Sequence, residues 1–159
     1  MGDFFQTQNA EILSGITDYS WLQLYSEVGE DLSRWPTEKH FTSWLGLAPG
    51  QNHSGKRKRN KKKGNSEVGQ IFKRIAQSLL NSKYIGWGAF ARRLKGRKGP
   101  AIAIKATGRK IAIQYWRLMV KGAEFVENGV KAYQEQLKNY KKKQLNKLAL
   151  ELDITIVPI

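Results

Sequence analysis

The sequence predicts an all-α protein. Apolar residues recur three and four positions apart in several stretches, which is the period of an amphipathic helix. Glycine, proline and hydroxyl residues stand at the ends of these stretches, where helices begin and end. With 159 residues and 40% hydrophobic side chains, the chain can bury one core, as a single domain or as a domain with an appendage.

The first fifty residues are predicted to form three short helices, each with a capping residue before it or a glycine after it. The expected helices are Gln8–Leu13, a helix from Thr17 to Gly29, and a helix from Pro36 to Gly46. The residues expected on their apolar faces are Trp21, Leu22, Leu24, Tyr25 and Val28 in the second helix, and Phe41, Trp44 and Leu45 in the third.

Residues 50–66 are predicted to form a loop, because three glycines interrupt the stretch and seven like charges would repel one another in a helix. The clearest helix begins at Ser66 and Glu67. Its apolar positions recur at i, i+3, i+4, i+7 and i+8. They are Val68, Ile71, Phe72, Ile75, Ala76, Leu79 and Leu80.

Three further helices are expected downstream. A helix over Tyr84–Leu94 is followed by a basic turn, Lys95–Pro100, and Pro100 suits the first position of the next helix, which runs to about Val120. Gly122 is the expected C-cap, and a long Lys-rich helix covers Glu127–Leu152 before an apolar tail. The Pro100 helix is expected to bury some of Ile104, Ile111, Tyr115, Leu118 and Met119. The last helix is polar and carries Tyr133, Leu137, Tyr140, Leu145, Leu148 and Leu152.

The five tryptophans divide into two groups. Trp21, Trp44, Trp87 and Trp116 lie at helical spacing from other apolar residues, so we expect them in the core rather than in base-stacking platforms. Trp35 precedes Pro36 in a polar stretch, and we expect it to be exposed.

The net charge of +15 is concentrated in the middle of the chain. Residues 51–122 carry twenty Lys and Arg side chains and one carboxylate, Glu67, whereas residues 1–50 carry two basic and seven acidic side chains. Neutralising phosphates is the favoured use of such a local excess, and a membrane surface is disfavoured because the basic run lacks interleaved large apolar residues. There is no cysteine and only His40 and His53, which excludes a disulfide framework and a zinc site, and no bound metal is expected.

The basic residues form clusters that we predict to contact the nucleic-acid backbone. The alternatives are a solvated loop for residues 56–63, and cations that merely complement a helix C-terminus near Lys95. The predicted nucleic-acid-binding residues are Lys56, Arg57, Lys58, Arg59, Lys61, Lys62, Lys63, Arg74, Arg92, Arg93, Arg97, Lys98, Arg109 and Lys110.

Ser54 lies in a turn at the start of the densest of these clusters. A serine hydroxyl is a weak nucleophile unless a base, a metal or nearby charge assists it, and Lys and Arg would offset charge that builds on an attacked phosphate. His53 is adjacent but points the other way in an extended loop, so it is no obvious base. Two interpretations stay open: a nucleophile that attacks phosphate, and an inert residue of a phosphate-binding turn.

Several segments together resemble one family. These are FTSWLGLAP over 41–49, Ser54-Gly55, and Gly64-Asn65 ahead of the amphipathic helix, with weaker likeness in 88–94, 101–112 and 122–126. The chain resembles, over roughly residues 10–159, the C-terminal half of insertion-sequence transposases of the IS-one-ten type, which are DEDD transposases and RNA-guided recombinases. The spacing Gly-Leu-x-Pro-x4-Ser-Gly carries most of the resemblance.

The resemblance implies that Ser54 attacks a DNA phosphodiester and becomes transiently joined to it. It also implies a structured guide RNA, an oligomeric active complex, and Mg²⁺ held by a separate RuvC-like domain, which we expect to be missing from this chain. Residues 1–46 are then a lead-in that resembles a degenerate helix-hairpin-helix with Thr17 in place of its second glycine, 47–125 the catalytic-serine and DNA-binding core, and 126–159 a Lys-rich helix and tail.

A cytoplasmic, nucleoid-associated protein is expected, with DNA as its partner and no membrane. The alternatives are a non-catalytic nucleic-acid-binding module and a decayed remnant of a transposase.

Overall fold

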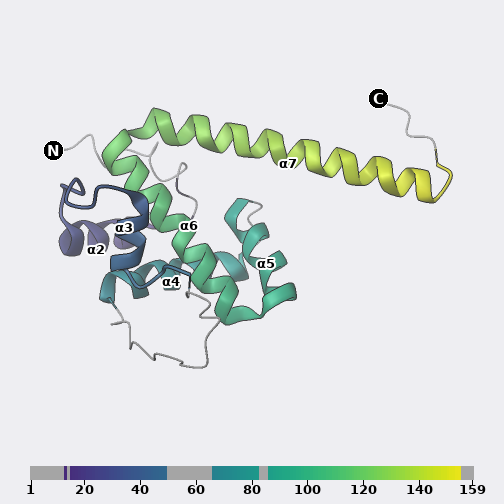
Figure 1. Ribbon diagram of the computed structural model, residues 1–159. Helices are drawn as coiled ribbons and strands as arrows, with labels where there is room; N and C mark the ends of the chain where they lie inside the picture. Colours follow the sequence, from purple (N-terminus) through teal and green to yellow (C-terminus); the bar gives the residue numbers. More distant parts are fainter. Residues whose placement is uncertain (1–12, 14, 50–65, 83–85, 155–159) are drawn as a thin grey trace, which may run out of the picture.

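The computed structural model describes residues 13, 15–49, 66–82 and 86–154. This part of the chain forms helices and contains no strand, which confirms the all-α prediction (Figure 1). The helices are α2 (Asp18–Val28), α3 (Glu38–Trp44), α4 (Glu67–Asn81), α5 (Gly86–Lys98), α6 (Pro100–Lys121) and α7 (Ala123–Glu151). The helix predicted over Gln8–Leu13, the loop over 50–66 and most of the apolar tail lie outside or largely outside the described residues.

The predicted helix starts are confirmed where hydroxyl residues cap them. The side chain of Thr17 accepts a hydrogen bond from the Ser20 amide at 3.3 Å, and Thr37 accepts one from the His40 amide at 3.4 Å. Each bond satisfies an amide that the first turn of a helix leaves without a partner. Gly29 ends α2, as its position in the sequence predicts.

Helix α4 matches its prediction over its whole length. Ser66 is the N-cap, and every apolar residue expected on its inner face is buried. This helix packs against α2, α5 and α6, so the stripe is covered from three directions. A seven-residue apolar stripe on a 15-residue helix is therefore the centre of the fold.

Helix α6 passes across α4 and carries the residue at the middle of the core. The ring of Tyr115 is fully buried, with centroids 5.2 Å from Trp21, 5.7 Å from Phe72 and 6.3 Å from Phe41. These partners come from α2, α4 and α3, so one side chain joins four helices. Tilted and edge-on ring contacts of this kind are favourable beyond the area that they bury.

The junction between α3 and α4 depends on the absence of a side chain. A Cβ added at Gly69 would collide with the backbone carbonyl oxygen of Leu45. Both residues are buried, and the close approach lets the end of α3 lie directly on the first turn of α4. Glycine is required here for space rather than for its backbone angles.

Two predicted boundaries were wrong. The segment Lys95–Lys98 is the last turn of α5 and not a separate turn, because the helix ends at Gly99, whose amide bonds the carbonyl of Lys95 at 3.0 Å. Helix α7 begins at Ala123 rather than Glu127, because Gly122, at φ 86°, is both the C-cap of α6 and the N-cap of α7. That left-handed angle suits glycine and turns the chain within one residue.

The predictions for Trp35, Trp44 and Leu22 were also wrong. Trp35 is 8% exposed and its carbonyl accepts a hydrogen bond from the indole Nε1 of Trp116 at 3.2 Å, because the turn before α3 folds over α6. Trp44 is 45% exposed and lies 4.8 Å from the Trp35 ring, so it covers the core from outside. Leu22 lies on the solvent side of α2, which buries only Leu24 and Val28.

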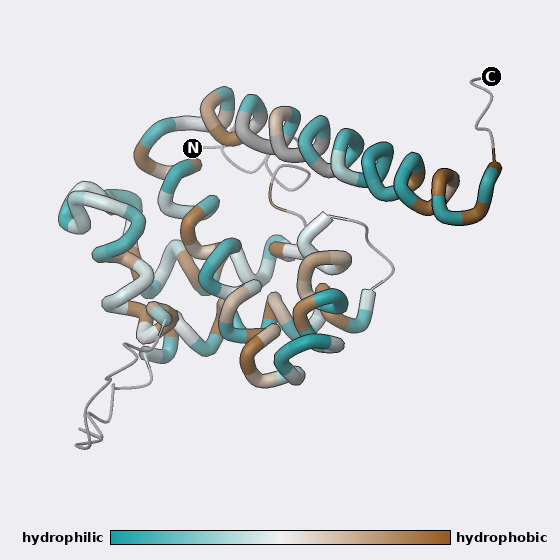
Figure 2. Tube along the Cα trace, turned by 45° about the vertical axis from the view of Figure 1, so that its right-hand side comes forward, coloured by the Kyte–Doolittle hydropathy of each residue, from teal (hydrophilic) through white to brown (hydrophobic). Residues whose placement is uncertain are grey.

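Helix α7 differs from the rest because most of it projects from the body. Figures 1 and 2 both show its far end extending beyond α5, and its main packing partner is α6. Val126, near its start, is buried, whereas Tyr140, Leu145, Leu148 and Leu152 are exposed. A long helix carrying these apolar residues was predicted, and none of the four is buried within the described chain.

Candidate nucleic-acid interface

The predicted site residues separate into two groups. Ser54 and the cluster Lys56, Arg57, Lys58, Arg59, Lys61, Lys62 and Lys63 lie outside the described residues, so the proposed nucleophile and its loop stay predictions. The remaining seven are Arg74 on α4, Arg92, Arg93, Arg97 and Lys98 on α5, and Arg109 and Lys110 on α6.

The last seven residues of helix α5 are rich in exposed cations. Its 13 residues include no carboxylate, and five basic side chains over its last seven residues are all exposed. Arg92 donates a hydrogen bond to the backbone carbonyl of Ser82, which fixes the orientation of α5 against the end of α4. The α5 cations are Arg92, Arg93, Lys95, Arg97 and Lys98.

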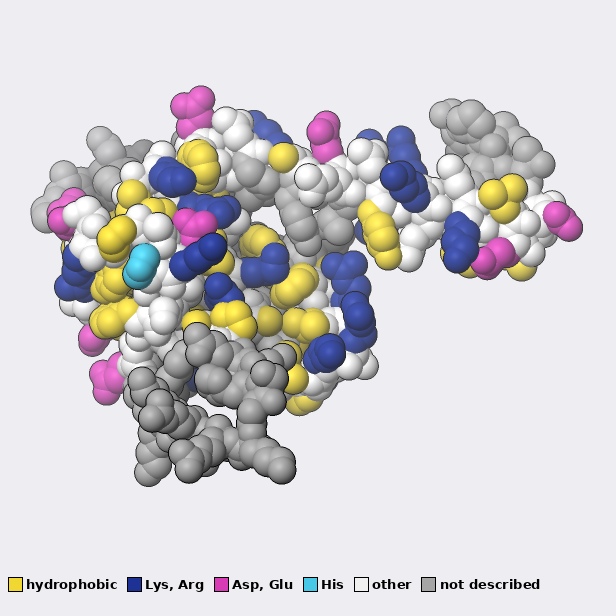
Figure 3. Space-filling model, in the orientation of Figure 1, with side chains coloured by type: hydrophobic (Ala, Val, Ile, Leu, Met, Phe, Trp, Pro, Cys, Tyr) yellow, Lys and Arg dark blue, Asp and Glu magenta, His cyan; other side chains and the backbone are white. Residues whose placement is uncertain are grey.

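The outer face of α6 continues this charge. Lys110, Arg117 and Lys121 follow one another at intervals of seven and four residues and therefore share a face, whereas Arg109 lies to one side of it and Lys105 lies farther round the helix. Lys105, Arg117 and Lys121 were not among the predicted residues, although the helical spacing that identifies apolar faces also relates the positions of basic residues. Figure 3 shows Lys and Arg side chains gathered over α5 and α6 on one face, with hydrophobic side chains between them.

Lys110 of α6 lies beside two aromatic rings of α5. Its Nζ lies 5.2 Å from the ring centroid of Trp87 and 4.9 Å from that of Phe90, both on α5. Burial, and secondarily the charge of Arg117, lower the pKa of Lys110. An anion bound beside this ammonium would offset both effects and favour its charged form. The aromatic residues hold the cation at the surface between α5 and α6.

Arg117 is held by a carboxylate from another helix. Its Nη2 donates to Oε1 of Glu38 on α3 at 2.9 Å, and this hydrogen bond is the main reason that the pKa of Glu38 is lowered. Lys121 also contributes to the lowering. The Nε atoms of Arg109 and Arg117 are buried and make no hydrogen bond within the described residues. Each guanidinium therefore has one N–H donor, at Nε, that no described residue uses and that is buried away from solvent.

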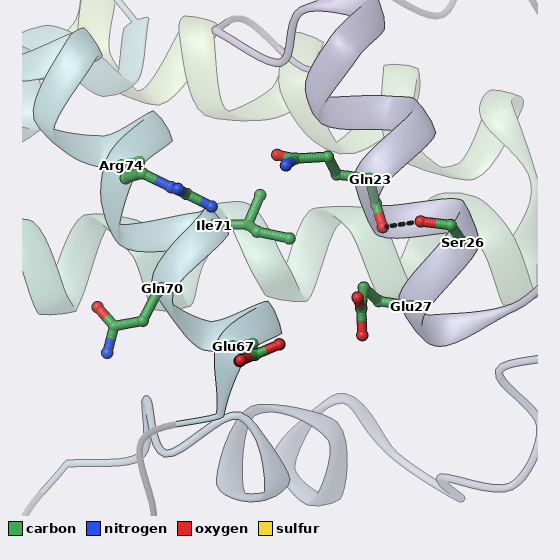
Figure 4. Close-up of a pocket in the computed structure, with 7 residues that line it drawn as sticks. All are labelled: Gln23, Ser26, Glu27, Glu67, Gln70, Ile71 and Arg74. Carbon is green, nitrogen blue, oxygen red and sulfur yellow. Dashed lines mark hydrogen bonds between the residues drawn. The ribbon is translucent and has the colours of Figure 1, made fainter.

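Arg74 is not part of this surface. It lines a groove between α2 and α4 whose other charged residues are Glu27 and Glu67 (Figure 4). The remaining lining residues are Gln23, Ser26, Gln70 and Ile71. Two carboxylates against one guanidinium make the groove acidic, which disfavours a phosphate there.

Neither a metal centre nor a membrane span is visible in the described part of the chain. Over residues 15–49, 66–82 and 86–154, no three His, Asp or Glu side chains lie together in a way that could hold a metal ion. No helix in that part is long and apolar enough to cross a membrane.

The amino-acid sequence matches one known protein family. Residues 8–89 match the family described as Transposase IS116/IS110/IS902 family. This range includes α2, α3, Ser54 and α4, and it ends in the first turn of α5. No curated protein matches the chain. No solved structure matches it either.

Proposed function

Because the chain belongs to the IS116/IS110/IS902 family of transposases, we propose that it binds DNA through the cationic face of α5 and α6 and supplies Ser54 as a nucleophile for strand exchange. The observation that carries the binding half of this proposal is the surface itself. Helices α5 and α6, which pack together, carry ten basic residues and no carboxylate, and Glu38 of α3 is paired with one of them, Arg117.

The arrangement suits a nucleic-acid backbone better than a small anion. The α5 cations follow the helix for about two turns, and Lys110, Arg117 and Lys121 follow one face of α6 for about three turns. Arg and Lys spread along such a surface neutralise successive phosphates and release their counterions, which favours binding without sequence preference. We expect the Lys56–Lys63 cluster to add to the same interaction.

The nucleophile is proposed from sequence. Ser54 lies within the family match and precedes the densest cationic run of the chain. In the proposed step, the Ser54 oxygen forms a bond to phosphorus and the bond to the leaving deoxyribose oxygen breaks, so that the hydroxyl proton passes to that oxygen or to solvent. Nearby cations would stabilise the charge that develops on the phosphate oxygens. The phosphoserine bond conserves the energy of the broken ester, and a second exchange releases the serine.

Further components complete the proposed complex. We propose that a structured guide RNA, a RuvC-like domain with Mg²⁺-binding carboxylates, and further copies of the chain take part. The described residues supply no group that fits Mg²⁺, so the carboxylates would come from the RuvC-like domain. A cytoplasmic, nucleoid-associated location follows from the same proposal.

DNA-binding measurements on the full chain test the first half of the proposal. Replacing Arg93 and Arg97 by Glu should weaken binding to unrelated duplexes equally, by about tenfold or more, because two favourable phosphate contacts become repulsive. Glu124→Lys and Glu135→Lys, both on α7, serve as controls, because they change charge outside the α5–α6 surface. A loss confined to one DNA sequence, or equal affinity for all variants, would contradict a backbone-binding role.

Strand exchange in a reconstituted complex tests the second half. Ser54→Ala should abolish strand exchange and leave DNA binding unchanged, because the hydroxyl oxygen is the attacking atom. Ser54→Cys keeps a nucleophile at the same position and is the matched variant. Unchanged strand exchange by Ser54→Ala would end the assignment and favour a non-catalytic nucleic-acid-binding module.

A further inference from the structure

The far half of α7 carries an apolar stripe that nothing in the described chain covers. Tyr140 and Leu148 are eight residues apart, and Leu145, Leu148 and Leu152 follow at intervals of three and four, so they share one side of the helix. Tyr140 is 51% exposed and Leu148 is 54% exposed. Gln144 donates a hydrogen bond to the Tyr140 hydroxyl at 2.8 Å and lies on the same side. A contiguous exposed stripe of this kind marks a surface for another macromolecule.

Positive charge surrounds this stripe. Residues 138–150 contain five lysines and no carboxylate. Lys141 lies within reach of Leu145 and Leu148 on the stripe itself, and Lys138 and Lys142 lie along one edge. A partner for this surface must therefore offer apolar contacts and negative charge together.

The outer face of α2 has both of these properties. Tyr19 and Leu22 are one turn apart and strongly exposed, and Gln23 donates to the Tyr19 hydroxyl at 3.1 Å on the same face. Residues 18–33 contain four carboxylates and no basic residue, and all four are exposed. They are Asp18 at the start of α2, Glu30 and Asp31 just beyond its end, and Glu27, which also lines the groove between α2 and α4.

The two surfaces cannot meet within one molecule. Figure 1 shows α2 at one side of the body and the far end of α7 beyond the other side. We propose that the far half of α7 in one copy of the chain docks on the outer face of α2 in a second copy, with Tyr140 and Leu148 against Tyr19 and Leu22 and the lysines against the carboxylates.

This contact joins different surfaces on the two copies. It is therefore a head-to-tail interface, which closes into a ring or extends as a chain of copies. Pairing α7 with α7 is disfavoured, because the five lysines of each helix would face those of the other. Nucleic acid would satisfy the lysines alone and would leave the leucines exposed.

Self-association of the nuclease-treated full chain, measured by sedimentation in the wild type and in charge-reversed variants, tests the proposal. The wild-type chain should self-associate at low salt, about 50 mM, where charges are weakly screened. Lys141→Glu with Lys142→Glu should weaken self-association by about tenfold, and so should Glu27→Lys with Glu30→Lys, because each change places like charges across the contact. An equimolar mixture of the two variants should associate as the wild type does, because each supplies the surface that the other lacks.

A control and a second variant complete the test. Lys39→Glu with Lys131→Glu makes the same change of net charge on α3 and on the near half of α7, and it should leave self-association unchanged. Leu148→Ser removes an exposed apolar contact without a charge change and should also weaken association. A wild-type chain that is monomeric at all concentrations, or a variant mixture that associates no better than its components, would overturn the proposal. Loss of DNA binding with intact self-association in the α7 variant would assign the surface to nucleic acid instead.

Discussion

Helices α4 and α7 show how one sequence pattern produces two outcomes. Both carry apolar residues at intervals of three and four, and both were predicted to be helices. The stripe of α4 is buried by three neighbouring helices, whereas the far half of α7 leaves its leucines in solvent. The pattern therefore predicts a helix with an apolar face. Whether the face is buried depends on what the rest of the chain, or another molecule, places against it.

The largest contrast is expected between Phe72 on α4 and Leu148 on α7. Phe72→Ala should lower the free energy of unfolding by about 3–5 kcal/mol, because it leaves a cavity beside Phe41 and Tyr115. Leu148→Ser should change it by less than about 0.5 kcal/mol at concentrations where the chain is monomeric, because that side chain is exposed. Urea unfolding measures both, and equal effects would contradict the difference between the two helices.

Alanine substitutions at a buried and at an exposed glycine should change the free energy of unfolding in opposite directions. Gly69→Ala should cost about 3 kcal/mol, because the new methyl group collides with the Leu45 carbonyl at the junction of α3 and α4. Gly96→Ala, near the exposed end of α5, meets no atom within 4 Å and should stabilise by about 0.5–1 kcal/mol through helix propensity. Thermal unfolding of the two variants reports both shifts, and a stable Gly69→Ala chain would show that α3 and α4 are not in close contact.

The smallest contrast is expected between one ion pair that joins two helices and one that lies along α7. Glu38→Gln should cost up to about 1 kcal/mol, because it removes the 2.9 Å contact between α3 and α6. Glu151→Gln, on the exposed 3.8 Å pair with Lys147 on α7, should cost about 0.3 kcal/mol or less. Chemical denaturation of each variant against the wild type measures these differences.

The Glu38 effect should also depend on pH. The pKa of Glu38 is lowered in the folded chain by its hydrogen bond with Arg117, so its stabilisation is present above the unfolded pKa of about 4.3 and is lost as pH falls through the folded value. The difference between wild type and Glu38→Gln should therefore disappear in acid. A difference that persisted below the folded pKa would show that Glu38 acts through shape rather than charge.

Much of the fold could be predicted because the deciding signals are local. Thr17, Thr37 and Ser66 cap helices with their own side chains, and α4 carries its whole apolar face within 15 residues. The predicted exposures of Trp35 and Trp44 were the reverse of those observed. Their burial depends on how the turn before α3 folds over α6, which no local pattern encodes. The end of α5 was misplaced because the charges of Lys95–Lys98 resemble a loop, although cations are favourable in the last turn of a helix.

The candidate site was predicted in part for a similar reason. The cations of α5 and the pair Arg109 and Lys110 are adjacent in sequence and are easily recognised. Arg117 and Lys121 join them only through the turns of α6, and the aromatic support of Lys110 comes from another helix. Arg74 was included because it is basic, and only the fold shows that it faces Glu27 and Glu67.

The salt dependence of DNA binding tests the central proposal, a cationic α5–α6 surface that binds the nucleic-acid backbone, most directly. Titration of the full chain with a fluorescent duplex, at several salt concentrations, gives the slope of log K against log salt. If six or more phosphates are neutralised, affinity should fall by about a thousandfold between about 50 and 200 mM salt, and Arg93→Glu with Arg97→Glu should reduce the slope by about two. A slope near zero, or the same slope in the variant, would contradict the assignment of this surface to nucleic acid.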